Sequence, residues 1–316
     1  MKTSKLKTKC IKIWLVFIYL LLFNGGFSQT KYFLYEEDSK EFIASSFTLN
    51  THSLYKIKRE VRLFNVMSKV QTFIGNKGIY NGQHDYNIML FSILPDLDGS
   101  EDWYEINLDT VQSSMINFKN LEELHKKNTL SHFNNVVKQT TKYFNDYKVI
   151  VKKGSTYYAS KYCLLQFYTV RNRPQAFTNV YGTINTQDSM HSVAQFGKIF
   201  KNAYPSLQFP LYRIGEDPLS FLDWSRDRRE YLSKQITLPH HGTGYQFWTY
   251  VDWTQHDYNY DFERGIDRFI YVPEKGIIGG SFDFYFYHHR KKLPIKYTDF
   301  LNNIKEEKVM VAKEFD

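Results

Sequence analysis

The residues best suited to chemistry in this sequence gather between positions 240 and 257. That window contains three of the ten histidines, two of the five tryptophans and two aspartates. Imidazole and carboxylate groups ligate zinc and similar ions, and a histidine can transfer protons near neutral pH. The window therefore supplies a candidate catalytic set, which consists of His240, His241, Asp252, His256 and Asp257.

The spacing of these residues is unlike that of an established metal or nucleophile motif. On a strand through this window, Asp252 and His256 share a face but stand about 13 Å apart, at ~3.3 Å per residue. His240 and His241 are adjacent, so a strand directs them to opposite faces. We therefore expect no cofactor. A divalent metal held by His240, His256 and Asp257 is the alternative.

The same window could instead present a stacking platform for a ligand. On an alternating strand, Trp248 and Tyr250 lie on one face with Asp252, while the apolar residues between them form the core face. Aromatic rings can stack on a sugar or peptide while a carboxylate hydrogen-bonds it. Burial of Trp248 under a helix would count against this platform.

Two further charged segments are candidate sites. Asp96 to Asp102 is acidic and could coordinate Ca²⁺, but its glycine comes two residues too early for an EF-hand, so a solvated turn is expected. His288 to Lys292 is basic and could contact an acidic polymer, although a solvated loop is the simpler explanation. Three glycines between Gly276 and Gly280 indicate a bulge or close packing rather than a nucleotide loop.

The N-terminal segment has the pattern of a secretory signal peptide over residues 1–28. Five lysines precede an apolar run from Ile13 to Phe23, and small residues at Gly26 and Ser28 precede Gln29. The run is shorter than the ~20 residues of a comfortable membrane span, so an uncleaved N-terminal anchor is the alternative. We expect a soluble mature protein in the periplasm or outside the cell, with no membrane span.

Removing the leader changes what charge and cysteine content imply. The whole chain carries a net charge of +8, but without the five leader lysines 36 basic residues face 33 acidic ones, which leaves +3. So small an excess is poor evidence for nucleic-acid binding, and no nucleic-acid partner is expected. Cys163 is then the single cysteine, so an internal disulfide is excluded and a buried thiol is expected.

Hairpins dominate the predicted secondary structure, and rings, at 18% of the chain, favour strands. Hairpins are predicted over residues 31–49, 148–170 and 268–287, with a core strand over 87–94. Helices are predicted over 119–145 with a break at 128–129, over 190–202, from 218 onward and after Thr298. His125 and His132 are expected on the surface.

These elements predict an α+β fold, a mainly antiparallel, aromatic-rich sheet of hairpins with several helices packed on it. Residues 29–316 are expected to form a single domain, with a subdivision near residue 110 as the alternative. In the last hairpin, Arg268 is expected opposite Ser281, which predicts a contact between Arg268 and Asp283.

The sequence favours a non-catalytic protein that binds an extracytoplasmic ligand or partner, a carbohydrate being one candidate, through the aromatic C-terminal sheet. The competing hypothesis is a metal-dependent or acid–base, hydrolase-like enzyme with its site at 240–257. Convergence of His240, His256 and a carboxylate in one pocket would favour the enzyme.

Overall fold

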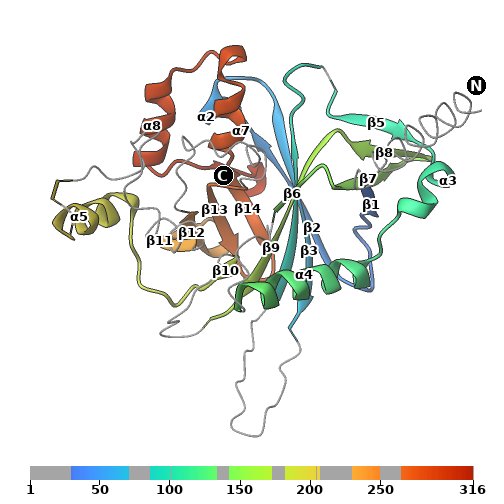
Figure 1. Cartoon of the computed structure of the whole chain (residues 1–316), viewed down its shortest axis with the longest axis horizontal. Helices are drawn as coiled ribbons and strands as arrows, with labels where there is room; N and C mark the ends of the chain where they lie inside the picture. The colour runs from blue at the N-terminus through green and yellow to red at the C-terminus, as the bar shows by residue number, and fades with distance from the viewer. Residues whose placement is uncertain are drawn as a thin grey trace, which may run out of the picture.

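A computed structural model of the chain describes residues 30–70, 86–99, 101–133, 142–172, 182–203, 205–206, 230–249 and 265–315. Within these residues three β-sheets form successive layers. Figure 1 shows the central sheet edge-on, with a four-stranded sheet on its right and a five-stranded sheet on its left. The α+β class, mainly antiparallel and aromatic-rich, is confirmed. No helix among the described residues is long and apolar enough to cross a bilayer.

The central sheet has inner strands that are buried on both faces and an edge strand, over residues 43–50, that is partly exposed. Its order is β10–β9–β4–β3–β2, and β6 also pairs with β9. The bounds are β2 Ile43–Asn50, β3 Glu60–Lys69, β4 Tyr86–Leu94, β6 Lys142–Phe144, β9 Tyr162–Val170 and β10 Thr183–Ile184. The predicted core strand over 87–94 is β4, and the run after Tyr162 is a central strand as expected. Cys163 is fully buried in β9, also as expected.

Successive residues of these strands belong to two different hydrophobic cores. Leu63, Leu90 and Leu164 face the core shared with the five-stranded sheet. Their neighbours Phe64 and Phe91 face the core shared with the four-stranded sheet and helix α4 (Phe118–Phe133). Because side chains alternate along a strand, a run that is apolar at every position can be covered only by two layers.

The four-stranded sheet has the order β1–β7–β8–β5. Its bounds are β1 Lys31–Leu34, β5 Trp103–Ile106, β7 Tyr147–Lys153 and β8 Thr156–Ser160. The predicted hairpin over 31–49 is wrong, because β1 pairs in parallel with β7 whereas β2 pairs with β3 of the central sheet. The hairpin over 148–170 holds for β7 and β8, and the chain then enters the central sheet at Tyr162.

The five-stranded sheet is an antiparallel meander of β11 to β15. Its bounds are β11 Glu230–Leu238, β12 Gly242–Thr249, β13 Arg268–Val272, β14 Gly276–Ser281 and β15 Met310–Val311. Arg268 lies opposite Ser281, and its Nη1 is 2.6 Å from Oδ2 of Asp283, so the predicted contact is confirmed. A bulge between Ile270 and Tyr271 sets this register.

The last hairpin ends sooner than its alternating pattern predicts. The strand stops at Ser281 and helix α7 (Asp283–His288) follows, where a strand to Tyr287 is expected from the sequence. Side chains hold the backbone there, because Phe282 N donates to the Tyr55 hydroxyl at 2.7 Å and Phe284 N donates to Asp267 at 3.3 Å. The aromatic side chains of α7 are therefore buried as parts of a helix, and not on one face of a strand as the alternating pattern predicts.

Two side-chain amides join the central sheet to the five-stranded sheet. Asn65 of β3 donates to Ile277 O at 3.0 Å and accepts from Ile277 N at 2.8 Å. Gln166 of β9 accepts from Ile266 N at 2.9 Å. The approach at Asn65 requires glycine at Gly276, which has φ +87°, and a Cβ there would lie 2.5 Å from Asn65 Oδ1. Close packing at the 276–280 glycines is thus confirmed.

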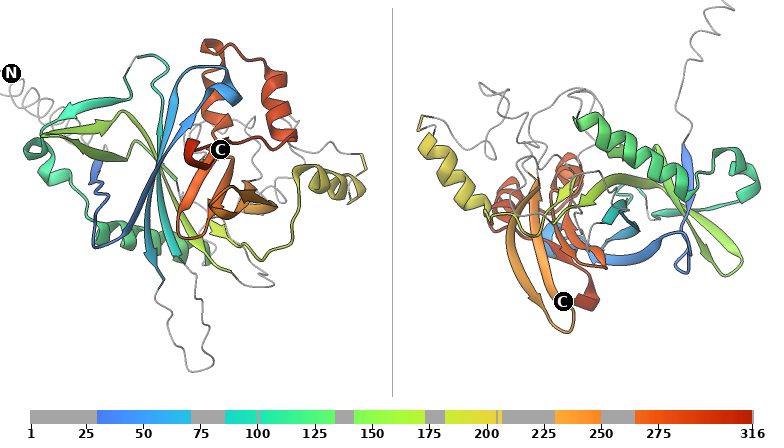
Figure 2. Two further views of the ribbon diagram at one scale, coloured as in Figure 1. Left: turned by 180° about the vertical axis from the view of Figure 1, so that it is seen from behind. Right: turned by 90° about the horizontal axis from the view of Figure 1, so that it is seen from below.

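The remaining helices lie on the outside of the layers (Figures 1 and 2). Helix α4 runs through residues 128–129 without the predicted break, and residues 142–144 are a strand instead of its continuation. The helix expected over 190–202 is α5 (Val193–Ala203). The segment from 218 lies outside the described residues. Short helices complete the chain: α2 His52–Tyr55, α3 Leu108–Val111, η1 Gln112–Ser114, η3 Arg290–Lys292, α8 Tyr297–Lys305 and η4 Lys313–Phe315.

The surface position expected for His125 is wrong. The side chain of His125 is only 3% exposed, because α4 lays it against the Phe167 ring of β9. Its Nε2 donates to Tyr168 O at 3.1 Å. Burial lowers the pKa of His125 to about 4, since the charged imidazolium would lose its hydration. The side chain of His132 lies outside the described set.

We expect His125 to make stability depend on acid pH. Because its pKa is lower in the folded than in the unfolded chain, unfolded molecules bind more protons between about pH 6.5 and 4, and stability falls as pH falls through that window. Relative to His125→Gln, the wild type should lose roughly 3 kcal/mol of unfolding free energy between pH 7 and 4. Urea unfolding at each pH measures this difference. An NMR titration of the folded protein giving an ordinary imidazole pKa for His125 would contradict it.

Candidate functional site

The described candidates of the 240–257 window lie at the tip of the β11–β12 hairpin. His240 and His241 form the turn between Leu238 and Gly242, and both are exposed. His240 has φ 63°, and His241 N donates to Leu238 O at 3.1 Å. The His241 ring lies 4.4 Å from the Phe315 ring near the C-terminus. Figure 2 (right) shows this hairpin tip beside the C-terminal end of the chain.

The other members of the predicted catalytic and metal sets, Asp252, His256 and Asp257, lie outside the described residues, as does Tyr250 of the predicted stacking platform. The convergence of His240 and His256 therefore stays a prediction. Among the residues that are described, no group of three or more His, Cys, Asp or Glu side chains is arranged to hold a metal ion.

Trp248 is a core residue. It is 2% exposed, its ring stacks on Tyr231 at 4.7 Å, and it meets Phe196 of α5 edge-on at 5.4 Å. Its indole Nε1 donates to His191 O at 2.8 Å. Both the ring and its polar atom are thus occupied within the protein, which counts against Trp248 as the stacking platform predicted with Tyr250 and Asp252.

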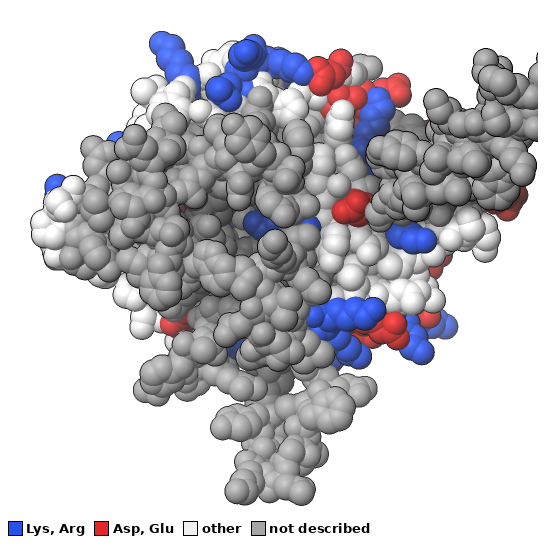
Figure 3. Space-filling model, in the orientation of Figure 1, with Lys and Arg blue, Asp and Glu red and all other residues white. Residues whose placement is uncertain are grey.

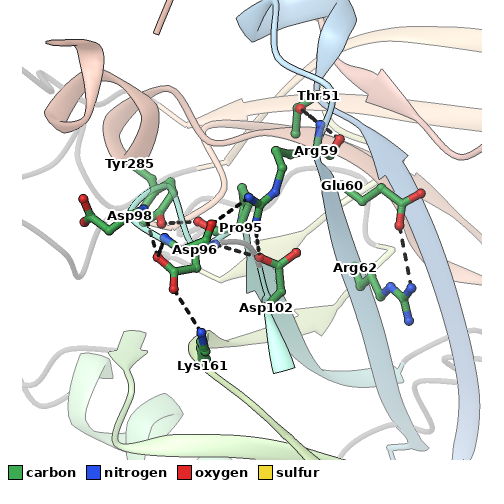
Figure 4. Close-up of polar contacts among 11 residues, drawn as sticks. Thr51, Arg59, Glu60, Arg62, Pro95, Asp96, Asp98, Asp102, Lys161 and Tyr285 are labelled. Atoms are coloured by element: carbon green, nitrogen blue, oxygen red, sulfur yellow. Dashed lines mark hydrogen bonds and ion pairs between the residues drawn. The ribbon is translucent and has the colours of Figure 1, made fainter. Parts of the chain in front are cut away.

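The acidic segment after β4 is fastened to its surroundings (Figure 4). Asp96 accepts from Asp98 N at 3.0 Å and from Gly99 N at 2.9 Å, and Lys161 Nζ lies 3.3 Å from its other oxygen. Asp96 is 7% exposed, so it is not part of a solvated turn. These bonds hold the pKa of Asp96 below its usual value although burial opposes them.

Two of the three remaining acids of this loop, Asp98 and Asp102, also have cationic partners, whereas Glu101 is exposed. Arg59 forms an ion pair with Asp102 and donates to Gly99 O at 3.0 Å (Figure 4). Lys292 forms an ion pair with Asp98. Carboxylates committed to bases and to backbone N–H groups are poorly suited to Ca²⁺, which takes six to eight oxygen ligands. Through Arg59, Lys161 and Lys292, the loop therefore joins the starts of β3 and β9 to η3.

A second polar cluster is buried at the start of α7. Asp267, Arg268, Asp283 and Tyr55 are each at most 5% exposed, and the Tyr55 hydroxyl donates to Asp283 at 3.0 Å. Burial, and then the neighbouring Asp283 carboxylate, raise the pKa of Asp267 well above its usual value. The four side chains are buried and contact one another, so we assign this cluster to stability.

Among the described residues, one groove contains a residue of the predicted site, His241. It has a volume of about 410 Å³ and lies between the β11–β12 turn, the β13–β14 turn, η4 and the edge strand β2. Its lining residues are Tyr35, Glu37, Ala44, Ser45, Ser46, Phe47, His241, Lys275, Glu314 and Phe315. We call it the His241 groove.

The floor of the His241 groove is aromatic. Phe47 and Phe315 meet edge-on at 5.5 Å, and the Tyr35 ring is packed edge-on against Phe64 at 4.8 Å. Tyr35 is 5% exposed, and its hydroxyl is enclosed next to Ser46, whose side chain acts to lower the pKa of Tyr35. Burial, and then the Glu37 carboxylate, outweigh this effect and raise the pKa of Tyr35, so the phenol stays neutral. Because the hydroxyl is enclosed, Tyr35 contributes its ring to the floor and not its polar atom.

The rim of the groove is polar and carries both signs of charge. Glu37, Glu314, Lys275 and His241 are exposed around the opening. The Ser46 hydroxyl donates to Glu37 Oε1 at 3.3 Å. The rim thus offers acceptors, donors and an imidazole above an apolar floor, a combination typical of small-molecule sites.

The sequence identified one lining residue, His241, and missed the others. All the lining residues together come from five separate segments, and no spacing along the chain links Tyr35 with Lys275 or Phe315. A C-terminal Glu-Phe dipeptide has no distinctive pattern. The groove could be found only after the three sheets were stacked.

Comparison with known proteins adds no relative to this description. No protein-family model, no curated protein and no solved structure matches the chain.

Proposed function

We propose that this chain is an exported, non-catalytic binding protein that holds a saccharide in the His241 groove. The observation that carries the proposal is the lining of the groove, where the polar groups of Glu37, Lys275, Glu314 and His241 surround an aromatic floor. Donors and acceptors around an apolar surface suit a ligand that has many hydroxyl groups and apolar C–H faces.

The individual groups of the groove support the same ligand class. Glu37 and Glu314 can accept hydrogen bonds from sugar hydroxyls, and Lys275 can donate to sugar oxygens. Phe315 offers an apolar surface for the C–H face of a sugar ring. The volume of about 410 Å³ falls within the range of small-ligand pockets, ~300–1,000 Å³.

Binding without catalysis is favoured by the contacts that the groove side chains make. A hydroxyl nucleophile needs a neighbouring base that a third group orients. Here the Ser46 hydroxyl donates to Glu37 and the Ser45 hydroxyl to Lys275 O at 2.5 Å, while the His241 ring packs on Phe315. These contacts do not join a hydroxyl to the imidazole.

Export is supported by the basic, apolar and small-residue order of residues 1–28. N-terminal sequencing of the native protein tests it. We expect the mature chain to begin at Gln29. A native chain that begins at Met1 and partitions with membranes would show an N-terminal anchor instead.

A glycan array probed with labelled protein of residues 29–316 tests the saccharide. We expect selective binding to neutral glycans, and we expect His241→Asn to weaken it about five- to tenfold, as the loss of one hydrogen bond at the rim requires. His240→Asn in the same turn is the matched control, because His240 does not line the groove, and it should bind as the wild type does. An array without selective binding would overturn the proposal, as would equal binding by His241→Asn.

A further inference from the structure

Helix α2, between β2 and β3, forms one structural unit with the helices that follow β14. The Tyr55 ring of α2 stacks on Phe286 of α7 at 3.7 Å, and Tyr287 of α7 meets Phe300 of α8 edge-on at 5.7 Å. Asn303 of α8 donates to Leu54 O at 3.1 Å. We call α2 with the link to Lys58, α7, η3 and α8 the helical cap. It lies at the upper left in Figure 1.

The exposed surface of the helical cap is strongly basic. Its exposed bases are Lys305 and a set of six residues, Lys56, Lys58, Arg290, Lys291, Lys292 and Lys296. Among the described residues, only Lys292 of this set has an acidic partner, Asp98. The Arg290 guanidinium lies over the Tyr287 ring, 4.2 Å from its centroid, and its charge remains uncompensated. Figure 3 shows blue side chains along this upper edge.

The acids of the helical cap do not neutralise these bases. Asp283 and Glu307 are buried, and Asp299 accepts from the Lys296 backbone N–H at 2.7 Å. Glu306 pairs with Lys308, with 2.6 Å between Oε2 and Nζ. Since 36 bases and 33 acids remain after residue 28, the cap concentrates positive charge on one face of a nearly balanced chain.

We propose that the helical cap binds an acidic polysaccharide through Lys56, Lys58, Arg290, Lys291 and Lys296. Repeated carboxylates or sulfates along such a polymer can contact several of these bases at once, and each contact releases a counterion. This surface is separate from the His241 groove and does not depend on a ligand there.

Two other anionic partners fit the cap less well. Insertion into an anionic membrane needs exposed apolar side chains, and the large exposed ones among the described residues, Ile43, Met190 and Ile199, lie outside the cap. Single-stranded nucleic acid needs free rings on which bases stack, whereas Tyr285 and Tyr287 of the cap are buried and the partly buried Tyr297 ring already packs against Tyr287. A polymer recognised by charge alone requires neither feature.

Biolayer interferometry with the mature chain tests the proposal, with polygalacturonate and dextran sulfate as probes. We expect both to bind, with affinity falling about tenfold or more between 50 and 200 mM NaCl, and neutral dextran to give no signal. Absence of binding to both anionic polymers would overturn the proposal. Tighter binding to phosphatidylglycerol vesicles or to oligo(dT) would also overturn it, in favour of a membrane or a nucleic acid.

Two double substitutions test whether polymer binding depends on the helical cap or only on the net charge of the protein. Lys291→Gln with Lys296→Gln removes two charges from the cap and should weaken polymer binding about tenfold. Lys126→Gln with Lys127→Gln removes two charges from exposed positions of α4 and should change it less than about twofold. All four positions are exposed, so both variants should fold, which a melting curve checks. Equal losses in the two variants would contradict a dedicated surface.

Discussion

Replacing Arg268 with methionine lowers the free energy of unfolding by about 3–5 kcal/mol, the largest effect that we expect from one substitution. Arg268 is 3% exposed and its partner Asp283 is fully buried. Without the guanidinium, the Asp283 carboxylate still accepts the hydrogen bond from the Tyr55 hydroxyl. Its negative charge, however, then lies beside Asp267 in the interior without the cation of Arg268. The bond from Arg268 Nε to Lys308 O, 2.9 Å long, is lost as well.

Urea unfolding at pH 7 measures this loss. A partly exposed arginine of the central sheet serves as the control. Arg62 of β3 lies 3.7 Å from Glu60, and its side chain is 38% exposed. Arg62→Met should therefore change stability by less than about 1 kcal/mol. A loss below about 1 kcal/mol for Arg268→Met would mean that the buried charges are hydrated, contrary to their burial.

Asn65→Ala should cost about 2–4 kcal/mol, because it separates the central sheet from the five-stranded sheet at one point. The substitution removes two hydrogen bonds to Ile277 and leaves that residue's buried N–H and C=O without those partners. The truncation leaves a cavity beside Gly276, and the glycine has no side chain that could fill it.

Thermal and urea unfolding of Asn65→Ala should be compared with Asn302→Ala. Asn302 is exposed on α8, so its truncation should be nearly neutral. If both variants unfold alike, the Asn65 amide does not join the sheets as the hydrogen bonds indicate.

The sequence could predict elements whose signal is local. The runs at 87–94 and 162–168 are apolar except at Asn87, Ser92 and Gln166, which indicated core strands, and β4 and β9 are buried on both faces. The pairing of Arg268 with Asp283 followed from one turn and a strand period. The α+β class followed from the dominance of such hairpins.

Other features depend on contacts that no local pattern records. Residues 31–49 read as a hairpin, yet β1 and β2 lie in different sheets because Phe33 and Tyr35 pack on the central sheet. His125 sits among lysines and asparagines in the sequence, and only the docking of α4 on β9 reveals its burial. The His241 groove likewise exists only where distant turns meet.

An NMR titration of the mature chain with the strongest neutral glycan from the array tests the His241 groove most directly. We expect the backbone amide signals of residues 44–47, His241 and Phe315 to shift and saturate together, while those of β8 on the four-stranded sheet stay unchanged. Saturable shifts confined to another surface, or none around Tyr35 and His241, would contradict ligand binding in the groove.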